Sequence, residues 1–208
     1  MVFSSTQTEY TNQELKGVVY KNGSVSLKEF NSCLFVKCSF NETVFRECHF
    51  RECTFRKCDL SLVHFKDCSF SDTRFEDSQV LGVDWTETAW ANSKFSLTKP
   101  VDFLNCVINF STFMGMNLKQ INITKCIARE VSFEDANLTE ANCSFTDFTN
   151  SRFLHTNLTG ADLTGAKNYT IAAHLNILKK TRFSLPEAMS LLYSLDIVLT
   201  EYQIDSEY

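Results

Sequence analysis

The stretch "CSFNETVFRECHFRECTFRKCDLSLVHFKDCSF", from Cys38 to Phe70, decides the fold because it repeats every five residues. Phenylalanine recurs at positions 40, 45, 50, 55, 65 and 70, with Leu60 in the remaining place, and cysteine recurs at 38, 48, 53, 58 and 68. An α-helix repeats every 3.6 residues and a strand every two, so neither has this period. The stretch therefore predicts a coil whose repeating unit is five residues long.

The same period runs through most of the chain. A large apolar residue occupies every fifth position from Leu15 to Phe95 and, after a shift of three residues across 96–102, again from Phe103 to Leu163. From Cys33 on, the position two before the large residue usually holds a small one, and eight of the nine cysteines stand there, whereas Cys143 takes a large-residue position. The pattern predicts a repeat domain over 15–166, preceded by a lead-in segment over 1–14.

The geometry of the repeat follows from extended backbone. Residues two apart on such backbone point to the same side, so the small and large residues face inward and the other two positions turn a corner. Four units then close a square coil, and coils stack about 4.8 Å apart through backbone hydrogen bonds. Residues 20 apart should form ladders, such as Phe35, Phe55, Phe75 and Phe95. The expected fold is all-β, a quadrilateral β-helix.

The tail over 167–208 has lost the period, and we expect it to cover the open end of the coil. Ser184 and Glu187 have the spacing of a capping box, which predicts a helix over 184–199; a shorter one is expected over 171–179. Apolar residues lie on more than one side of the longer helix. We therefore expect a homodimer through this C-terminal cap, with Leu191, Leu195 and Val198 at its interface.

The repeat resembles the pentapeptide-repeat family, in which a small residue, Asp or Asn, and Leu or Phe are followed by two polar positions. Units that match this consensus closely are "ANLTE" (136–140), "TNLTG" (156–160) and "ADLTG" (161–165). The resemblance implies a right-handed quadrilateral β-helix, in agreement with the square coil expected from the spacing.

Composition excludes several classes of function. The net charge of −5 argues against direct nucleic-acid binding, and no apolar run is long enough for a membrane helix. We find no secretory signal and expect a cytoplasmic protein whose cysteines stay reduced. Successive cysteines fall on different sides of the square, so no metal site is expected, and no cofactor motif is present. The chain offers no nucleophile with a base and no carboxylate pair, so we expect no enzyme activity.

Acidic residues gather in the second part of the repeat region. Residues 31–70 hold six basic and five acidic side chains, whereas 71–165 hold seven and twelve. Glu47, Asp67 and Glu87 lie 20 apart and should form a vertical stripe. The candidate partner-binding acids are Asp72, Glu76, Asp77, Asp84, Glu87, Glu130, Glu134, Asp135 and Glu140. One interpretation is that the rod mimics the shape and charge of DNA and so binds a DNA-binding enzyme. The other is that these charges only keep the rod soluble.

A closer resemblance lies in "FRECTFRKCDLSL" (50–62), "LGVDWTETAW" (81–90), the shift before "DFLNC" (102–106) and "RFSLPEAMSLLYSLDI" (182–197). These segments resemble the albicidin-resistance branch of the family and, more distantly, the quinolone-resistance and microcin-immunity proteins. The resemblance implies a non-enzymatic protein that protects a type II topoisomerase, DNA gyrase or topoisomerase IV, from a poison or toxin. Thr98, Lys99 and Pro100 would form an exposed contact loop of three extra residues. The alternative is a structural or signalling scaffold that binds an unrelated protein.

Overall fold

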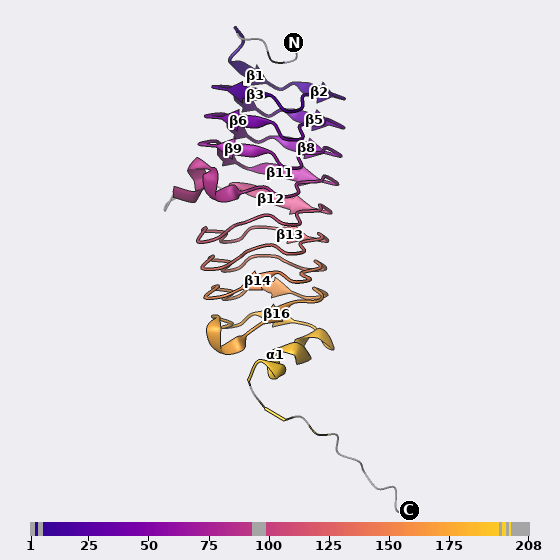
Figure 1. Ribbon diagram of the computed structural model, residues 1–208, viewed down its shortest axis with the longest axis vertical. Coiled ribbons are helices and arrows are strands. Elements are labelled where there is room, and N and C mark those ends of the chain that lie inside the picture. The colour runs from indigo at the N-terminus through magenta and orange to yellow at the C-terminus, as the bar shows by residue number, and fades with distance from the viewer. Residues whose placement is uncertain (1–2, 4–5, 93–98, 196, 199, 201–208) are drawn as a thin grey trace, which may run out of the picture.

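The computed structural model describes residues 3, 6–92, 99–195, 197, 198 and 200, which form a rod of stacked parallel strands (Figure 1). The N-terminal strands lie at the top of the rod in this view, and the short C-terminal helix lies at its bottom. The chain winds through about eight turns. The predicted all-β quadrilateral β-helix with a C-terminal helical cap is confirmed, although the α-helix itself is a single short turn.

Each strand pairs in parallel with the strand one turn later, so four sides can be followed along the rod. The first side carries β1 (Glu9–Thr11), β4 (Glu29–Asn31), β7 (His49–Arg51) and β10 (Ser69–Ser71). The second carries β2 (Glu14–Lys16), β5 (Leu34–Val36), β8 (Thr54–Arg56), β11 (Thr73–Glu76), β12 (Val101–Leu104), β13 (Ile123–Thr124), β15 (Asp162–Leu163) and β17 (Arg182–Phe183). The fourth carries β3 (Ser24–Ser26), β6 (Val44–Arg46), β9 (His64–Lys66), β14 (Arg152–Phe153) and β16 (Thr170–Ile171). Isolated bridges, such as Ser39 with Asp59, hold the third side.

Stacked phenylalanine rings fill the interior, as the inward register predicts. Phe35 lies 4.4 Å from Phe55 between ring centroids, and the two planes differ by 4°. Phe35 meets Phe40, on the next side, edge to face at 77°. Rings thus stack along each side and meet edge-on across corners, two arrangements that aromatic pairs favour. Each buried phenylalanine stabilises the fold by about 1.5–3 kcal/mol, and all nine cysteines are buried beside these rings.

The corners depend on left-handed backbone. The second residue after each large inward residue has a positive φ at almost every corner, as in Glu47 (50°), Asp67 (53°) and Glu130 (55°). This conformation is costly for residues other than glycine, asparagine and aspartate. The corner N–H groups donate to the next turn, for example from Glu47 to the carbonyl of Lys66 at 2.9 Å. The ladder of hydrogen bonds therefore offsets the strain of each corner.

The shift in the repeat is larger than the sequence suggests. Phe55 pairs with Phe75, 20 residues on, but Phe75 pairs with Phe103, 28 residues on. The extra segment therefore contains eight residues rather than three, and it follows the 3-10 helices η1 (Trp85–Glu87) and η2 (Ala89–Asn92). The ladder predicted from Phe75 to Phe95 is wrong, because Phe103 takes that place.

Part of the expected contact loop belongs to the hydrogen-bonded ladder. Asp72 donates its N–H to the carbonyl of Lys99 at 2.7 Å, and Thr73 donates to Pro100 at 3.2 Å. Lys99 and Pro100 are half-buried, so the expectation that both are exposed is wrong. Thr98 lies outside the described residues.

Parallel pairing continues past Ala166, where we expected the repeat region to end. The strand β16 pairs with β14, and β17 pairs with β15, although the large-residue period is lost there. The helix expected over 184–199 is reduced to the 3-10 turn η4 (Glu187–Met189) and α1 (Ser190–Tyr193), and that expected over 171–179 is the 3-10 turn η3 (Ala173–Leu175). Ser184 does not cap a helix; its hydroxyl accepts from the N–H of Gly165 at 2.9 Å.

The N-terminal end is covered by Phe3, which sequence reasoning left unassigned in the lead-in segment. Its ring lies 5.6–6.2 Å from the rings of Tyr10, Tyr20, Phe30 and Phe40. An open solenoid end exposes apolar side chains and unpaired strand edges, and Phe3 shields the apolar part.

Candidate protein-binding surface

The nine candidate acids do not form one cluster, because each unit of five residues turns the chain onto the next side. Five of them lie on the fourth side or at its corners: Asp84, Glu87, Glu130, Glu134 and Asp135. We call this the acidic side. Asp72, Glu76 and Asp77 lie on the second side and its corners, opposite the acidic side, and Glu140 lies at the corner between the first and second sides. In Figure 1, β3, β6 and β9 stand at the left and β2, β5 and β8 at the right.

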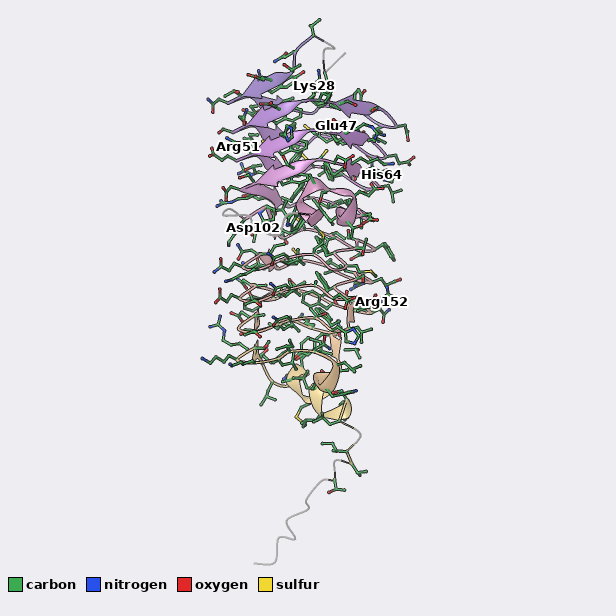
Figure 2. All side chains as sticks on the ribbon, turned by 90° about the vertical axis from the view of Figure 1, so that its left-hand side faces the viewer. Lys28, Glu47, Arg51, His64, Asp102 and Arg152 are labelled. Atoms are coloured by element: carbon green, nitrogen blue, oxygen red, sulfur yellow. The ribbon has the colours of Figure 1, made fainter. Side chains whose placement is uncertain are left out.

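The predicted vertical stripe runs along a corner of the acidic side. Asp67 donates its N–H to the carbonyl of Glu87 at 2.9 Å, which places the two corners directly above one another. Arg46 and Lys66 lie at matching positions of the adjacent strands β6 and β9, next to the stripe, and their positive charges offset part of the negative charge of the stripe. In Figure 2, His64 and Arg152 lie toward the right-hand edge of the rod, and Glu47 lies nearer its middle.

Most acids of this side have partners. Glu87 Oε2 lies 3.0 Å from His64 Nδ1, Glu134 Oε1 lies 3.2 Å from Arg152 Nε, and Asp135 Oδ1 lies 3.4 Å from His155 Nδ1. Asp84 accepts from the N–H of Thr86 at 2.9 Å and so caps η1. Exposed pairs of this kind contribute about 0–1 kcal/mol each.

Glu130 is the exception on the acidic side. Its carboxylate is exposed and has no hydrogen-bonding or ionic partner among the residues that the structure describes. It stands at the corner that leads from the third side into the acidic side, with φ 55°. Of the acids on this side, Glu130 is therefore the one whose charge is free to meet a cation from outside.

The cysteines are buried as predicted, and their chemistry follows from that burial. Burial raises the pKa of Cys53, Cys106 and Cys143 to about 12. A hydrogen bond between Cys58 and Cys38 raises the pKa of Cys58 and lowers that of Cys38, so Cys38 is the first of that pair to ionise. Within the described residues, no group of three or more His, Cys, Asp or Glu side chains could hold a metal ion.

The expected dimer residues lie in different surroundings. Leu191 is half-buried and packs against the core, so it belongs to the cap rather than to an open face. Leu195 and Val198 are exposed, Val198 at 89%. Leu185 and Tyr193 are also exposed here, at 77% and 70%, so the end of the rod presents apolar side chains to solvent. None of the helices in the described part of the chain has the length and apolar character that a membrane crossing requires.

Sequence reasoning missed Phe110, Ser132 and Arg152, which flank Glu130 along an open groove. The signal for Phe110 was present, because it is one of the few phenylalanines outside the inward register. Ser132 follows Glu130 by two residues at an ordinary outward position, and only the stacking of turns brings Arg152 into the same groove.

Stacked parallel turns, inward aromatic columns and outward polar corners define a β-solenoid protein. The chain belongs to the pentapeptide-repeat family: residues 28–100 match the pentapeptide repeat region, and residues 117–153 and 146–167 match pentapeptide repeats of eight copies, together more than half of the chain. No curated protein matches the chain in sequence.

Solved structures extend the likeness over nearly the whole chain. Full-length QnrB1, a plasmid-mediated fluoroquinolone resistance protein, is 18% identical with a TM-score of 0.52, covering 91% of this chain and 100% of its own. A trypsin-treated variant of QnrB1 is 16% identical with a TM-score of 0.54, covering 90% of this chain and 100% of its own. At this identity the likeness shows the fold.

Proposed function

We propose that this chain is a non-enzymatic protein that binds a type II topoisomerase, DNA gyrase first and topoisomerase IV second, and protects it from a poison or toxin. The observation that carries the proposal is the acidic side, which presents Asp84, Glu87, Glu130, Glu134 and Asp135 along one side of a regular rod. An enzyme that holds DNA offers a basic surface to phosphates, and a rod with carboxylates along one side can occupy it.

The relatives support the same partner. QnrB1, whose fold this chain shares, is a fluoroquinolone resistance protein. The resemblance to the albicidin-resistance branch, noted from residues 50–62 and 182–197, implies protection of gyrase. The whole chain carries a net charge of −5, so it would contact the enzyme rather than its DNA. Such a protein would act in the cytoplasm.

No catalytic step is part of this proposal. Pentapeptide-repeat solenoids are generally non-enzymatic, and here phenylalanine side chains fill the space inside the coils. Protection would arise from competition with DNA or from release of a drug-bound cleavage complex. We propose in addition that two chains join at their C-terminal ends through Leu195 and Val198.

The test is a gyrase supercoiling and cleavage assay with a panel of poisons and two triple variants. The first variant combines Glu130→Gln, Glu134→Gln and Asp135→Asn on the acidic side. The matched control combines Asp72→Asn, Glu76→Gln and Asp77→Asn on the opposite side, with the same change in charge. We expect the first to lose protection about tenfold or more and the control to keep it.

Equal loss in the two variants would show that overall charge, not the acidic side, matters. Absence of protection by the unaltered protein against every poison, with no binding to either topoisomerase, would favour the alternative of a scaffold for an unrelated protein.

A further inference from the structure

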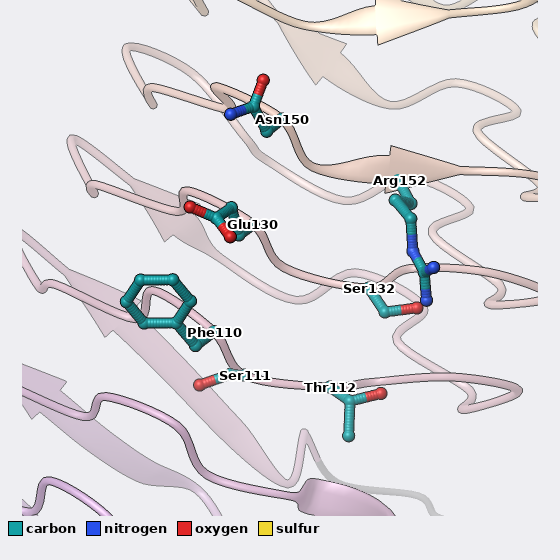
Figure 3. Close-up of a pocket in the computed structure, with 7 residues that line it drawn as sticks. All are labelled: Phe110, Ser111, Thr112, Glu130, Ser132, Asn150 and Arg152. Atoms are coloured by element: carbon teal, nitrogen blue, oxygen red, sulfur yellow. The ribbon is translucent and has the colours of Figure 1, made fainter.

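An open groove of about 500 Å³ runs along the corner between the third side and the acidic side (Figure 3). Phe110, Glu130 and Asn150 form one wall, at the same corner of three successive turns. Thr112, Ser132 and Arg152 form the other, where parallel bridges place them above one another. Figure 3 shows the two columns side by side, with the Phe110 ring next to the Glu130 carboxylate and the Ser132 hydroxyl directed away from them, toward Arg152.

Two polar groups in this groove lack partners. Ser132 stands at an outward position of the repeat, yet it is only 7% exposed, and its Oγ has no hydrogen-bond partner in the part of the chain that the structure describes. The carboxylate of Glu130 is likewise unpaired within the described residues. The Ser132 hydroxyl is covered and points away from Glu130, so the Glu130 carboxylate is the unpaired group that a ligand in the groove can reach.

The groove favours a cation over an anion. Its one basic side chain, Arg152, is already occupied by Glu134 at 3.2 Å, whereas Glu130 is free. Phe110 is 60% exposed, so its ring face is open to a planar or cationic group. The acceptors left over on the wall that carries Phe110 are the Glu130 carboxylate and the Asn150 amide oxygen, and they suit a group that only donates hydrogen bonds.

We infer that this groove binds an arginine side chain of a protein partner, with its guanidinium stacked on Phe110 and its N–H groups donated to Glu130. Arginine fits better than lysine because its planar guanidinium stacks on aromatic rings and presents several donors in a fixed fork. The inference deepens the proposed function and rests on it for the partner's identity, since a surface that binds DNA phosphates is rich in arginine.

The test uses a probe that does not depend on gyrase. Acetyl-arginine-methylamide is titrated into the full chain, labelled for NMR, and compared with the isosteric neutral citrulline analogue. We expect saturable shifts at Phe110, Glu130 and Asn150 with the arginine probe, and at least about fivefold weaker binding of the citrulline probe.

Variants locate the site. Glu130→Gln should weaken the arginine probe about three- to tenfold. Its matched control, Glu140→Gln, changes another left-handed corner with φ 58° and should have no effect. Phe110→Asn, a residue that such a corner accepts, should also weaken binding without unfolding the chain. Shifts that do not saturate, that are equal for citrulline, or that survive Glu130→Gln unchanged would overturn the inference.

Gyrase protection is then measured separately with Glu130→Gln. Probe binding without any gyrase protection by the unaltered chain would keep the arginine groove and reject the topoisomerase as partner. Gyrase protection without probe binding would keep the proposed function and reject the groove.

Discussion

At the scale of single residues, the corners decide which substitutions the rod tolerates. Glycine occupies only some of these left-handed positions, and two of its corners differ in their surroundings. A Cβ added to Gly165 (φ 68°) would lie 2.6 Å from the ring of Phe145, whereas one added to Gly115 (φ 69°) would meet nothing within 4 Å. The pair separates the strain of the backbone from the packing of a neighbouring side chain.

We predict that Gly115→Ala lowers the free energy of unfolding by about 1–2 kcal/mol, because an L-residue is strained in this conformation. Gly165→Ala should lower it by about 1 kcal/mol more, because the added methyl group meets the ring of Phe145. The measurement is urea unfolding of both variants. Adding Phe145→Asn to Gly165→Ala should reduce the loss to that of Gly115→Ala. Equal losses in the two single variants would show that Phe145 does not pack over Gly165.

The cysteines lead to a prediction about reactivity. A thiol reacts as its thiolate; burial raises the pKa of Cys53, Cys106, Cys126 and Cys143, and it keeps the reagent away from all nine thiols. We expect none of the nine to react rapidly with a thiol reagent in the native protein at pH 8, and all nine to react after denaturation. Rapid labelling of most of them before denaturation would contradict the inward register.

Asp147 links one residue to acid stability. Its partial burial alone would raise the pKa, but hydrogen bonds from Asn168 (2.9 Å), Thr149 (2.6 Å) and Arg129 (2.8 Å) hold the pKa of Asp147 well below its usual range. Because the folded-state pKa is depressed, the stabilisation is complete above the unfolded-state value near 3.8 and is lost as the pH falls toward the folded-state value.

We therefore expect Asp147→Asn to lower the free energy of unfolding by about 1 kcal/mol or more at pH 7. This difference in unfolding free energy from the unaltered chain should shrink as the pH falls below about 4. The measurement is urea unfolding across pH 2–7. Glu130→Gln, which removes an unpaired carboxylate, should leave stability unchanged throughout. If the loss of unfolding free energy in Asp147→Asn stays constant down to pH 2, the negative charge of Asp147 is not what stabilises the fold.

At the scale of elements, the extra segment before Val101 tests whether the stacking of turns requires a whole number of five-residue units in each turn. Deleting residues 93–100 removes the eight-residue excess, leaves Asn92 at the corner before Val101, and restores the 20-residue step between Phe75 and Phe103. Asparagine accepts the left-handed corner. We expect this variant to keep the fold and to lose at most about 1–2 kcal/mol.

Deleting 92–100, one residue more, is the matched control. It should be severely destabilising, because a step of the wrong length turns inward positions outward. Circular dichroism and urea unfolding distinguish the two. If both deletions fold equally well, the stacking does not depend on the five-residue count. If the eight-residue deletion folds but loses gyrase protection, the segment is a contact site.

The core could be predicted from sequence because its period is unusual and nearly unbroken, whereas the length of the extra segment could not. Shifts of three and of eight residues leave the same five-residue phase, so Phe95 and Phe103 are equally good inward residues until the pairing with Phe75 is known. Pairing beyond Ala166 was also hidden, because the parallel backbone pairing of β14 with β16 needs no repeat of large side chains.

The grouping of acids failed for a related reason. Asp77 and Asp84 are close in sequence, but the intervening corners carry them to nearly opposite sides. Glu87 and Asp135 are far apart in sequence and share the corner column of the acidic side. The number of residues in each turn of a solenoid decides which surface residues lie next to one another. A prediction of a surface site therefore needs the correct number of residues for every turn, including the turn of 28 residues between Phe75 and Phe103.

At the scale of the whole molecule, the two ends of the rod differ. Phe3 covers the N-terminal end and packs on several rings, while the C-terminal end exposes Leu185, Tyr193 and Val198. Exposed apolar side chains grouped at one end of a monomer favour association. Two rods joined there would span about 70 Å or more, from about eight turns in each at the strand spacing. That length suits a partner that is itself two-fold and holds DNA across its axis.

We predict a two-fold dimer at micromolar concentration that Val198→Glu or Leu195→Glu converts to a monomer, because a two-fold interface would bury the introduced charge twice. Leu191→Glu is a different case, since Leu191 packs on the core and its replacement should destabilise the cap itself. Mass in solution and gyrase protection are measured together. A wild-type chain that is monomeric at this concentration would reject the dimer, and a monomeric Val198→Glu variant with full protection would separate the dimer from the function.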